Sequence, residues 1–212
     1  MEGINSVKVY SIDEERLKFR VMMSVAGPFA SPDAGQYQFQ LPPLTAFGNS
    51  HEYPSCIINC DVLMAHAPIG TNDAVWNVRA AAGTVFGRAQ GLEVRMDVPS
   101  SQSIINHQLA AGLAGAGVNQ QGGFRQIVPT DMKLIGDGAG GIAGAGSYGW
   151  TGEGVGEPLL CGNPFGSDIT ISLRHPQTDA LTYLGSQGAG AGSPDVGLYC
   201  FQFTITMVPN SA

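Results

Sequence analysis

The sequence predicts an all-β protein, an antiparallel jelly-roll β-sandwich with long loops and one short inserted helix, forming a single domain over residues 1–212. Apolar and polar residues alternate with a period of two through much of the chain. Turns rich in Pro and Gly separate these segments, and strands do not alternate with long helices. The length is sufficient for one sizeable all-β core.

Two segments show the alternation most clearly. In LEVRMDV (residues 92–98), Leu92, Val94 and Met96 point one way, and charged residues point the other, which predicts a strand with one face in water. In LYCFQFTITMV (residues 198–208), aromatic and aliphatic residues alternate with Cys, Gln and Thr. The second segment predicts a long strand that closes the fold.

Eight further segments have strand character and are bounded by turn residues. They are residues 6–11, 17–25, 36–41, 57–65, 74–80, 123–135, 168–174 and 180–184. A short helix is expected after Pro99, in residues 100–115, because Ser101 can cap it and apolar residues follow at helical spacing. Long end loops favour a jelly roll, built from two Greek keys, over a barrel with tight hairpins.

The composition constrains the surface. Charged residues make up 13% of the chain, where about 25% is usual, and the net charge is −7. Two interpretations stay open: a soluble monomer with a polar, uncharged surface, or a surface largely covered by neighbouring subunits. Basic residues are few and scattered, so direct nucleic-acid binding is not expected.

The sequence also bears on location. No apolar run approaches the roughly 18 residues of a membrane-spanning helix, and the start, MEGINSVKVYSIDEERLKFR, lacks the apolar core of a signal peptide. We therefore expect a protein made in a cytosol, with no membrane span and with reduced cysteines.

A glycine-rich run begins at GDGAGG (residues 136–141), which fits the G-x-G-x-x-G pattern of dinucleotide-binding turns. Such a turn must open a helix, and the following IAGAGSYGWTGEGVGEP holds too many glycines for one. No cofactor is therefore expected. We interpret residues 136–156 as a 21-residue loop pinned to a neighbouring subunit, with Gly136, Gly138 and Gly141 allowing close approach and Tyr148 and Trp150 as anchors.

No catalytic or metal site is predicted. Cys56 and Cys60 are four residues apart and share a strand face, which favours core packing over a metal site that would need further ligands. The acidic pair Glu153 and Glu157 lies among glycines, a poor support for catalysis. The four histidines lack a nearby nucleophile motif, which leaves a hydrolase triad neither supported nor excluded, and a non-enzymatic protein is the expectation ahead of an enzyme.

The strand pattern, the low charge and the closing segment CFQFTITMVPNSA resemble small jelly-roll capsid and other virion proteins of icosahedral viruses. The resemblance implies a virion structural protein, a shell, vertex or decoration component assembled in the host cytoplasm, whose loops contact copies of itself and other virion proteins. Neither end of the chain is basic, unlike the genome-binding arms of many such proteins. The alternative is a carbohydrate-binding β-sandwich module, an adhesin or receptor-binding component, with a glycan stacked on Tyr148, Trp150 or Trp76.

Overall fold

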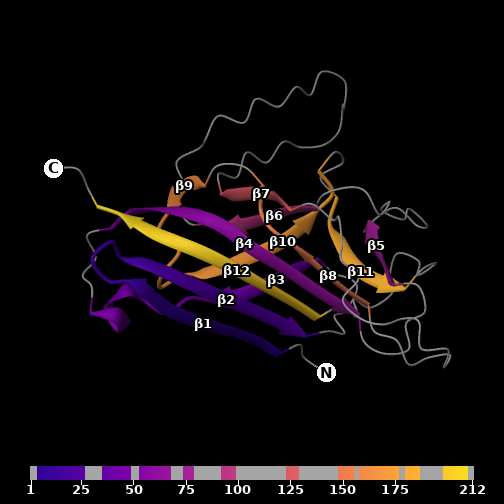
Figure 1. The fold of residues 1–212 in the computed structure, drawn as a ribbon, viewed down its shortest axis with the longest axis horizontal. Helices are drawn as coiled ribbons and strands as arrows, with labels where there is room; N and C mark the ends of the chain where they lie inside the picture. The colour runs from indigo at the N-terminus through magenta and orange to yellow at the C-terminus, as the bar shows by residue number, and fades with distance from the viewer. Residues whose placement is uncertain are drawn as a thin grey trace, which may run out of the picture.

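The structure is a computed structural model that describes residues 4–26, 35–48, 53–67, 74–78, 92–98, 123–128, 148–155, 158–176, 180–186 and 198–209. Nearly all of the regular structure in these residues is β-strand, and the strands form two main antiparallel sheets (Figure 1). The predicted all-β sandwich class is confirmed.

The larger sheet has six strands in the order β1-β2-β12-β4-β8, and β9 also pairs with β4. Strands β8 and β9 occupy the same edge of β4, one beside each half of it. The strands are β1 (Ile4–Asp13), β2 (Lys18–Ala26), β12 (Leu198–Val208), β4 (Ser55–Ala67), β8 (Tyr148–Gly152) and β9 (Leu159–Gly162).

The second sheet has four strands in the order β3-β10-β6-β7. They are β3 (Gln36–Gln40), β10 (Asp168–Arg174), β6 (Leu92–Asp97) and β7 (Phe124–Val128). A short 3₁₀ helix, η1 (Leu44–Phe47), follows β3, and β5 (Ala74–Val78) pairs with β11 (Thr182–Ser186) as a separate two-stranded sheet.

Each of the ten predicted strands overlaps an observed one, and β10 has the predicted bounds. Strands β8 and β9 were not predicted. The expected helix in residues 100–115 and the second part of the strand expected in residues 123–135 lie outside the described residues.

The core lies between the two sheets and is rich in aromatic rings. Tyr199, Phe201 and Phe203 of β12 alternate along its inner face and are at most 2% exposed. Tyr199 packs against Tyr37 of β3 with ring centroids 5.0 Å apart, and Phe203 meets Phe124 of β7 edge-on at 5.7 Å. These contacts join both sheets, so the alternation in β12 sets which face of the larger sheet is buried.

The outer face of β6 is less exposed to solvent than the sequence predicted. Arg95 forms a two-pronged ion pair with Glu93, with both nitrogen–oxygen distances at 2.9 Å, and these side chains are 14% and 12% exposed. The predicted alternation is present, but the face expected to lie in water is mostly covered. Pairing within the same strand neutralises the charges that this burial would otherwise isolate.

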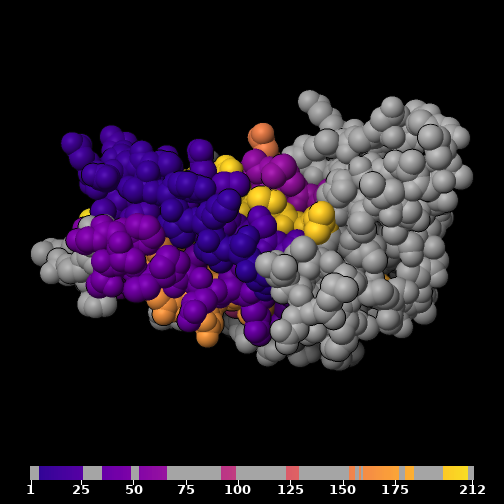
Figure 2. Space-filling view, turned by 90° about the horizontal axis from the view of Figure 1, so that it is seen from below, coloured from indigo at the N-terminus to yellow at the C-terminus, as the bar shows by residue number. Residues whose placement is uncertain are grey.

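The two sheets contact each other at both edges of the sandwich, which we call its margins, through different segments of the chain. At one margin β1 lies beside β3, and Asn5 Nδ2 donates a hydrogen bond to the Gln38 carbonyl at 2.6 Å. Figure 2 views the molecule from below and shows the indigo atoms of the β1–β2 hairpin spread over this margin. At the other margin, the segment after β8 bridges the sheets, because Gly154 N–H bonds to Cys60 O and Val155 N–H bonds to Ile127 O.

Candidate functional site

Some of the residues predicted to form a contact between subunits are not among the residues that the structure describes. Gly136, Gly138 and Gly141 lie outside the described residues. Tyr148 and Trp150 lie in β8, where their backbones pair with Ala67 and Ala65 of β4. Their roles as anchors stay predictions.

The interpretation of residues 136–156 as one continuous loop was wrong for its second part. Residues 148–152 form β8, and Val155 forms an isolated antiparallel bridge with Ile127. The long strand β4 offers backbone partners along its free edge, and this non-local pairing outweighs the poor strand propensity of the local glycines.

Cys56 and Cys60 are core residues, as expected. Cys56 and Cys60 are fully buried on the inner face of β4, and Cys161 of β9 is buried directly opposite Cys56. Burial raises the pKa of Cys60 to about 12, with a further rise from the neighbouring Asp61, and raises that of Cys161 to about 11. Burial, and secondarily Cys161, holds the pKa of Cys56 far above its ordinary value. These thiols stay protonated and unreactive at neutral pH.

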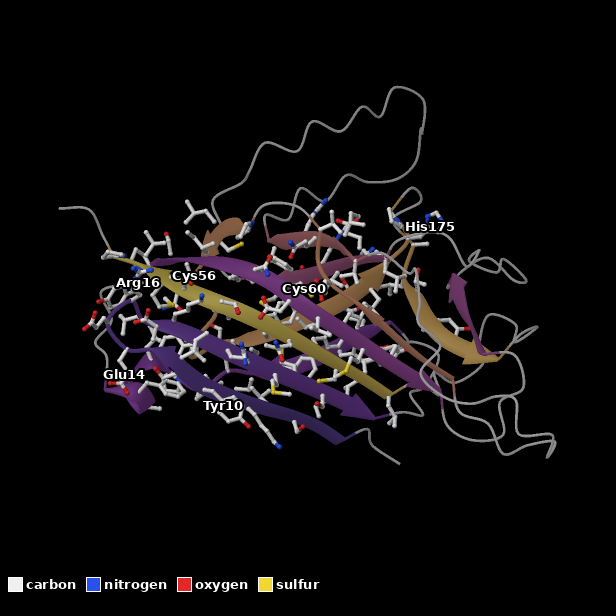
Figure 3. The ribbon with its side chains drawn as sticks, viewed as in Figure 1. Tyr10, Glu14, Arg16, Cys56, Cys60 and His175 are labelled. Carbon is white, nitrogen blue, oxygen red and sulfur yellow. The ribbon has the colours of Figure 1, made fainter. Side chains whose placement is uncertain are left out.

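Titratable groups do not converge on a catalytic arrangement within the described part of the chain. No group of three or more His, Cys, Asp or Glu side chains that could hold a metal ion occurs among those residues. His175 lies toward one end of the sandwich, and Glu14 and Arg16 lie at the other (Figure 3). Glu153 is exposed.

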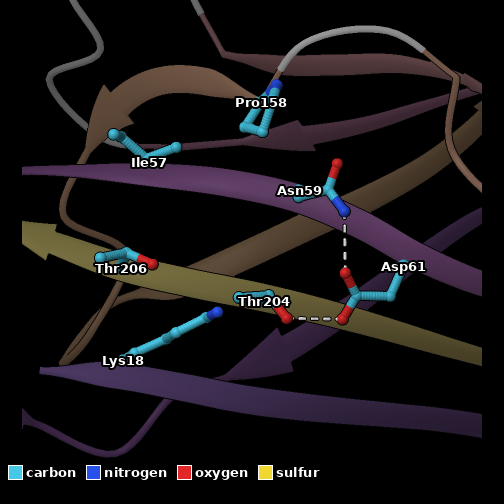
Figure 4. A pocket seen from close by; sticks show the side chains of 7 residues that line it. All are labelled: Lys18, Ile57, Asn59, Asp61, Pro158, Thr204 and Thr206. Atoms are coloured by element: carbon cyan, nitrogen blue, oxygen red, sulfur yellow. Dashed lines mark hydrogen bonds between the residues drawn. The ribbon is translucent and has the colours of Figure 1, made fainter. Parts of the chain in front are cut away.

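One pocket on the outer face of the larger sheet gathers polar side chains, and we call it the outer-face pocket. Its volume is about 260 Å³. Its lining comes from β2, β4 and β12 and from the residue before β9: Lys18, Ile57, Asn59, Asp61, Pro158, Thr204 and Thr206 (Figure 4). Antiparallel register explains the grouping, because Thr206 lies opposite both Lys18 and Ile57, so the three side chains form a row on one face.

A β-bulge in β4 lies at Asp61, a residue that lines this pocket. Cys60 pairs with Phe203 and Val62 pairs with Gln202, which leaves Asp61 as the extra residue. The bulge changes the alternation, so that Cys60 before it and Leu63 after it both face the core. Asp61 itself keeps the alternation of Ile57 and Asn59, whereas the residues after the bulge are shifted by one.

The Asp61 carboxylate is held by two hydrogen bonds. Asn59 Nδ2 donates to Oδ1 at 2.8 Å, and Thr204 Oγ1 donates to Oδ2 at 2.6 Å, as Figure 4 shows. Gln126 of β7 donates from Nε2 to Asn59 Oδ1 at 3.0 Å and so fixes the Asn59 amide in turn. The carboxylate is therefore oriented before any ligand arrives, and each oxygen keeps further acceptor capacity.

Lys18 supplies the positive charge in the pocket. Its side chain is half-buried and extends toward Thr204 and Asp61 (Figure 4). No hydrogen bond or ion pair joins its ammonium group to the described residues, in contrast to Arg95, which is paired with Glu93. A fixed carboxylate, two hydroxyls and a lysine ammonium can together bind a polar ligand through hydrogen bonds and charge.

Comparisons with models of protein families, with curated proteins and with solved structures gave no match to this chain. Within the described residues, no helix combines the length and apolar character that crossing a membrane would require.

Proposed function

We propose that this chain is a structural subunit that assembles with copies of itself into a closed shell, as a virion component. The observation that carries the proposal is the placement of exposed apolar side chains at both margins of the sandwich. Tyr10 and Ile12 are 48% and 42% exposed in β1, and Val155 and Ile127 are 59% and 39% exposed at the opposite margin.

The apolar pair at the β7 margin is contiguous. Val155 and Ile127 are direct partners in an antiparallel bridge, so their side chains lie side by side on one face. Figure 3 places Tyr10 on β1, at the margin farthest from β7. Different patches on opposite margins favour head-to-tail contact between copies, and contact of this kind closes into rings when the rotation between subunits allows it.

The strand pairing supports a jelly roll, the fold expected from the resemblance to virion proteins. Eight of the strands form four neighbouring pairs: β2 with β12, β3 with β10, β4 with β9, and β6 with β7. In chain order, the first of the eight therefore pairs with the last, the second with the seventh, the third with the sixth and the fourth with the fifth. A pattern of this kind is expected when one long antiparallel hairpin is wound into a sandwich, as in a jelly roll. Strands β1 and β8 extend the larger sheet, while β5 and β11 form the separate two-stranded sheet.

Low charge is consistent with an assembled state. The outer row of β12 is uncharged, and the charged fraction of the whole chain is 13%. Surfaces that become covered by neighbouring subunits are depleted in charge and enriched in apolar side chains. A fold alone does not define a function, so the proposal depends on assembly rather than on the sandwich itself.

The test compares three forms of the chain by sedimentation velocity. The double variant Ile127→Ser with Val155→Ser should assemble at least about tenfold more weakly than the native sequence, because burial of each large apolar side chain contributes about 1.5–3 kcal/mol. Met64→Gln is the matched control, since Met64 is 42% exposed on the outer face of β4 and belongs to neither of the two apolar pairs.

Two results would contradict the proposal at different levels. If the double variant assembles as well as the native chain, the β7 margin is not a contact. If the native chain itself stays monomeric, the assembly proposal fails. Thermal melting of all three forms checks that the substitutions leave the fold intact.

A further inference from the structure

We infer that the outer-face pocket is a binding site for a small hydroxylated carboxylate, of the class of acidic monosaccharides. The inference does not depend on the proposed assembly, because none of the four residues assigned to the contacts between copies lines the pocket. It rests on the complementary groups that line the pocket.

The ligand carboxylate is assigned to Lys18. Lys18 is a partly buried residue whose ammonium group has no hydrogen-bond or ion-pair partner among the described residues, so an anion that enters the pocket can form a charge-assisted hydrogen bond with it. Thr206 lies directly opposite Lys18 in the register of β2 and β12 and adds a hydroxyl next to this charge. Together they match a single carboxylate better than a neutral group.

The ligand hydroxyls are assigned to Asp61. The two hydrogen bonds from Asn59 and Thr204 hold the carboxylate in place, and its unused lone pairs face donors that enter the pocket. A carboxylate ligand without hydroxyl groups would meet repulsion from Asp61 and gain nothing from it. The pocket therefore selects a ligand that carries both an acid and hydroxyl donors.

The third feature is an apolar wall. Ile57 and Pro158 line the side of the pocket toward β9, and both side chains are exposed to solvent. The C–H face of a sugar ring can lie against such a wall while its hydroxyls point to the polar side. The volume of about 260 Å³ is below the range of about 300–1,000 Å³ that is typical for drug-sized ligands, which suits a single sugar residue.

The experiment uses the native chain and two sugars that differ at one carbon. Binding of glucuronate and of glucose is measured by ligand-observed NMR and by calorimetry at fixed ionic strength. Glucuronate should bind with a millimolar or lower Kd, and glucose should bind at least about tenfold more weakly, because it lacks the charge that pairs with Lys18.

Two variants test the assignment. Lys18→Gln should weaken glucuronate binding by at least about tenfold and leave the weak glucose binding unchanged. Lys8→Gln is the matched control, because Lys8 lies on the same outer face in β1 but does not line the pocket, and it should bind glucuronate like the native chain. Melting temperatures verify that both variants are folded.

The absence of glucuronate binding up to about 10 mM would overturn the inference, because such binding is weaker than ordinary specific recognition. Equal affinity of the native chain for glucuronate and glucose would overturn it as well. So would a Lys18→Gln variant that binds glucuronate as tightly as the native chain. None of these results would bear on assembly, which the sedimentation experiment measures separately.

Discussion

Gln126 of β7 accepts a hydrogen bond at Oε1 from the backbone N–H of Cys60 in β4, at 2.7 Å. Gln126 is 5% exposed and belongs to the second sheet, whereas Cys60 belongs to the larger one. The bond therefore ties the two sheets together next to the β-bulge. Because the same side chain also holds Asn59, it connects the inside of the sandwich to the outer-face pocket.

Replacing Gln126 by Leu should destabilise the protein by about 1–3 kcal/mol, because the buried Cys60 N–H would lose its partner. The free energy of unfolding in urea measures this loss. Gln202→Leu is the control, since Gln202 lies on the outer face of β12 and should change stability by less than about 0.5 kcal/mol. An equal loss of unfolding free energy in the two variants would show that the Gln126 hydrogen bond does not stabilise the contact between the sheets.

Gly154→Ala tests the close approach at the same place. An added Cβ would collide with the Cys60 carbonyl oxygen and come within 2.6 Å of the Gln126 side chain. We expect a loss of more than about 2 kcal/mol, as for overpacking in a core. Gly48→Ala provides the comparison, because Gly48 has φ +78° but open space around it, and its cost should stay near 1 kcal/mol. A smaller loss for Gly154→Ala than for Gly48→Ala would contradict the packing described for this margin.

Phe201→Ala tests the core that joins the sheets. Phe201 is fully buried, and its ring lies 6.1 Å from that of Tyr37 and 6.5 Å from that of Phe39, both in β3. Truncation should cost about 3–5 kcal/mol. Met64→Ala, on the exposed outer face, should cost less than about 1 kcal/mol. Denaturant unfolding of both variants makes the comparison, and a loss below 1 kcal/mol for Phe201→Ala would place this ring outside the core.

The buried thiols predict a fall in stability at alkaline pH. Cys60 and Cys161 have folded-state pKa values of about 12 and 11, above the ordinary value of 9.0. Their contribution is fully present below pH 9 and is lost as the pH rises toward the folded-state values, because the unfolded chain releases protons that the folded chain keeps.

Each such group adds a slope of up to about 1.4 kcal/mol per pH unit. Urea unfolding between pH 8 and pH 10 measures the slope, and Cys60→Ala should make it shallower. A free energy of unfolding that stays constant over this range, or an unchanged slope in Cys60→Ala, would mean that these thiols are not buried as described.

The sequence was most informative where the pattern is local. Residues of β12 and β6 alternate without interruption, so both strands and their inner faces could be predicted. Strand β8 could not, since its five residues lie among glycines and its pairing with β4 joins positions more than 80 residues apart.

No short sequence motif marks the residues that line the outer-face pocket. Its side chains come from four separate segments, and alternation within each strand indicates only that Lys18 of β2, Thr204 and Thr206 of β12, and Ile57, Asn59 and Asp61 of β4 lie on an outer face. The pairing of β12 with β2 and β4 sets which of these side chains lie side by side, and alternation within one strand does not predict that pairing. The candidate site therefore emerged from the register between strands rather than from any motif.

Assembly of this chain into a closed shell can be observed by electron microscopy of the purified native-sequence protein, with its mass followed by sedimentation. We expect closed particles of uniform size, far heavier than the 22.1 kDa chain. A well-folded species that sediments as a 22.1 kDa monomer at all concentrations, with no particles in the images, would contradict it.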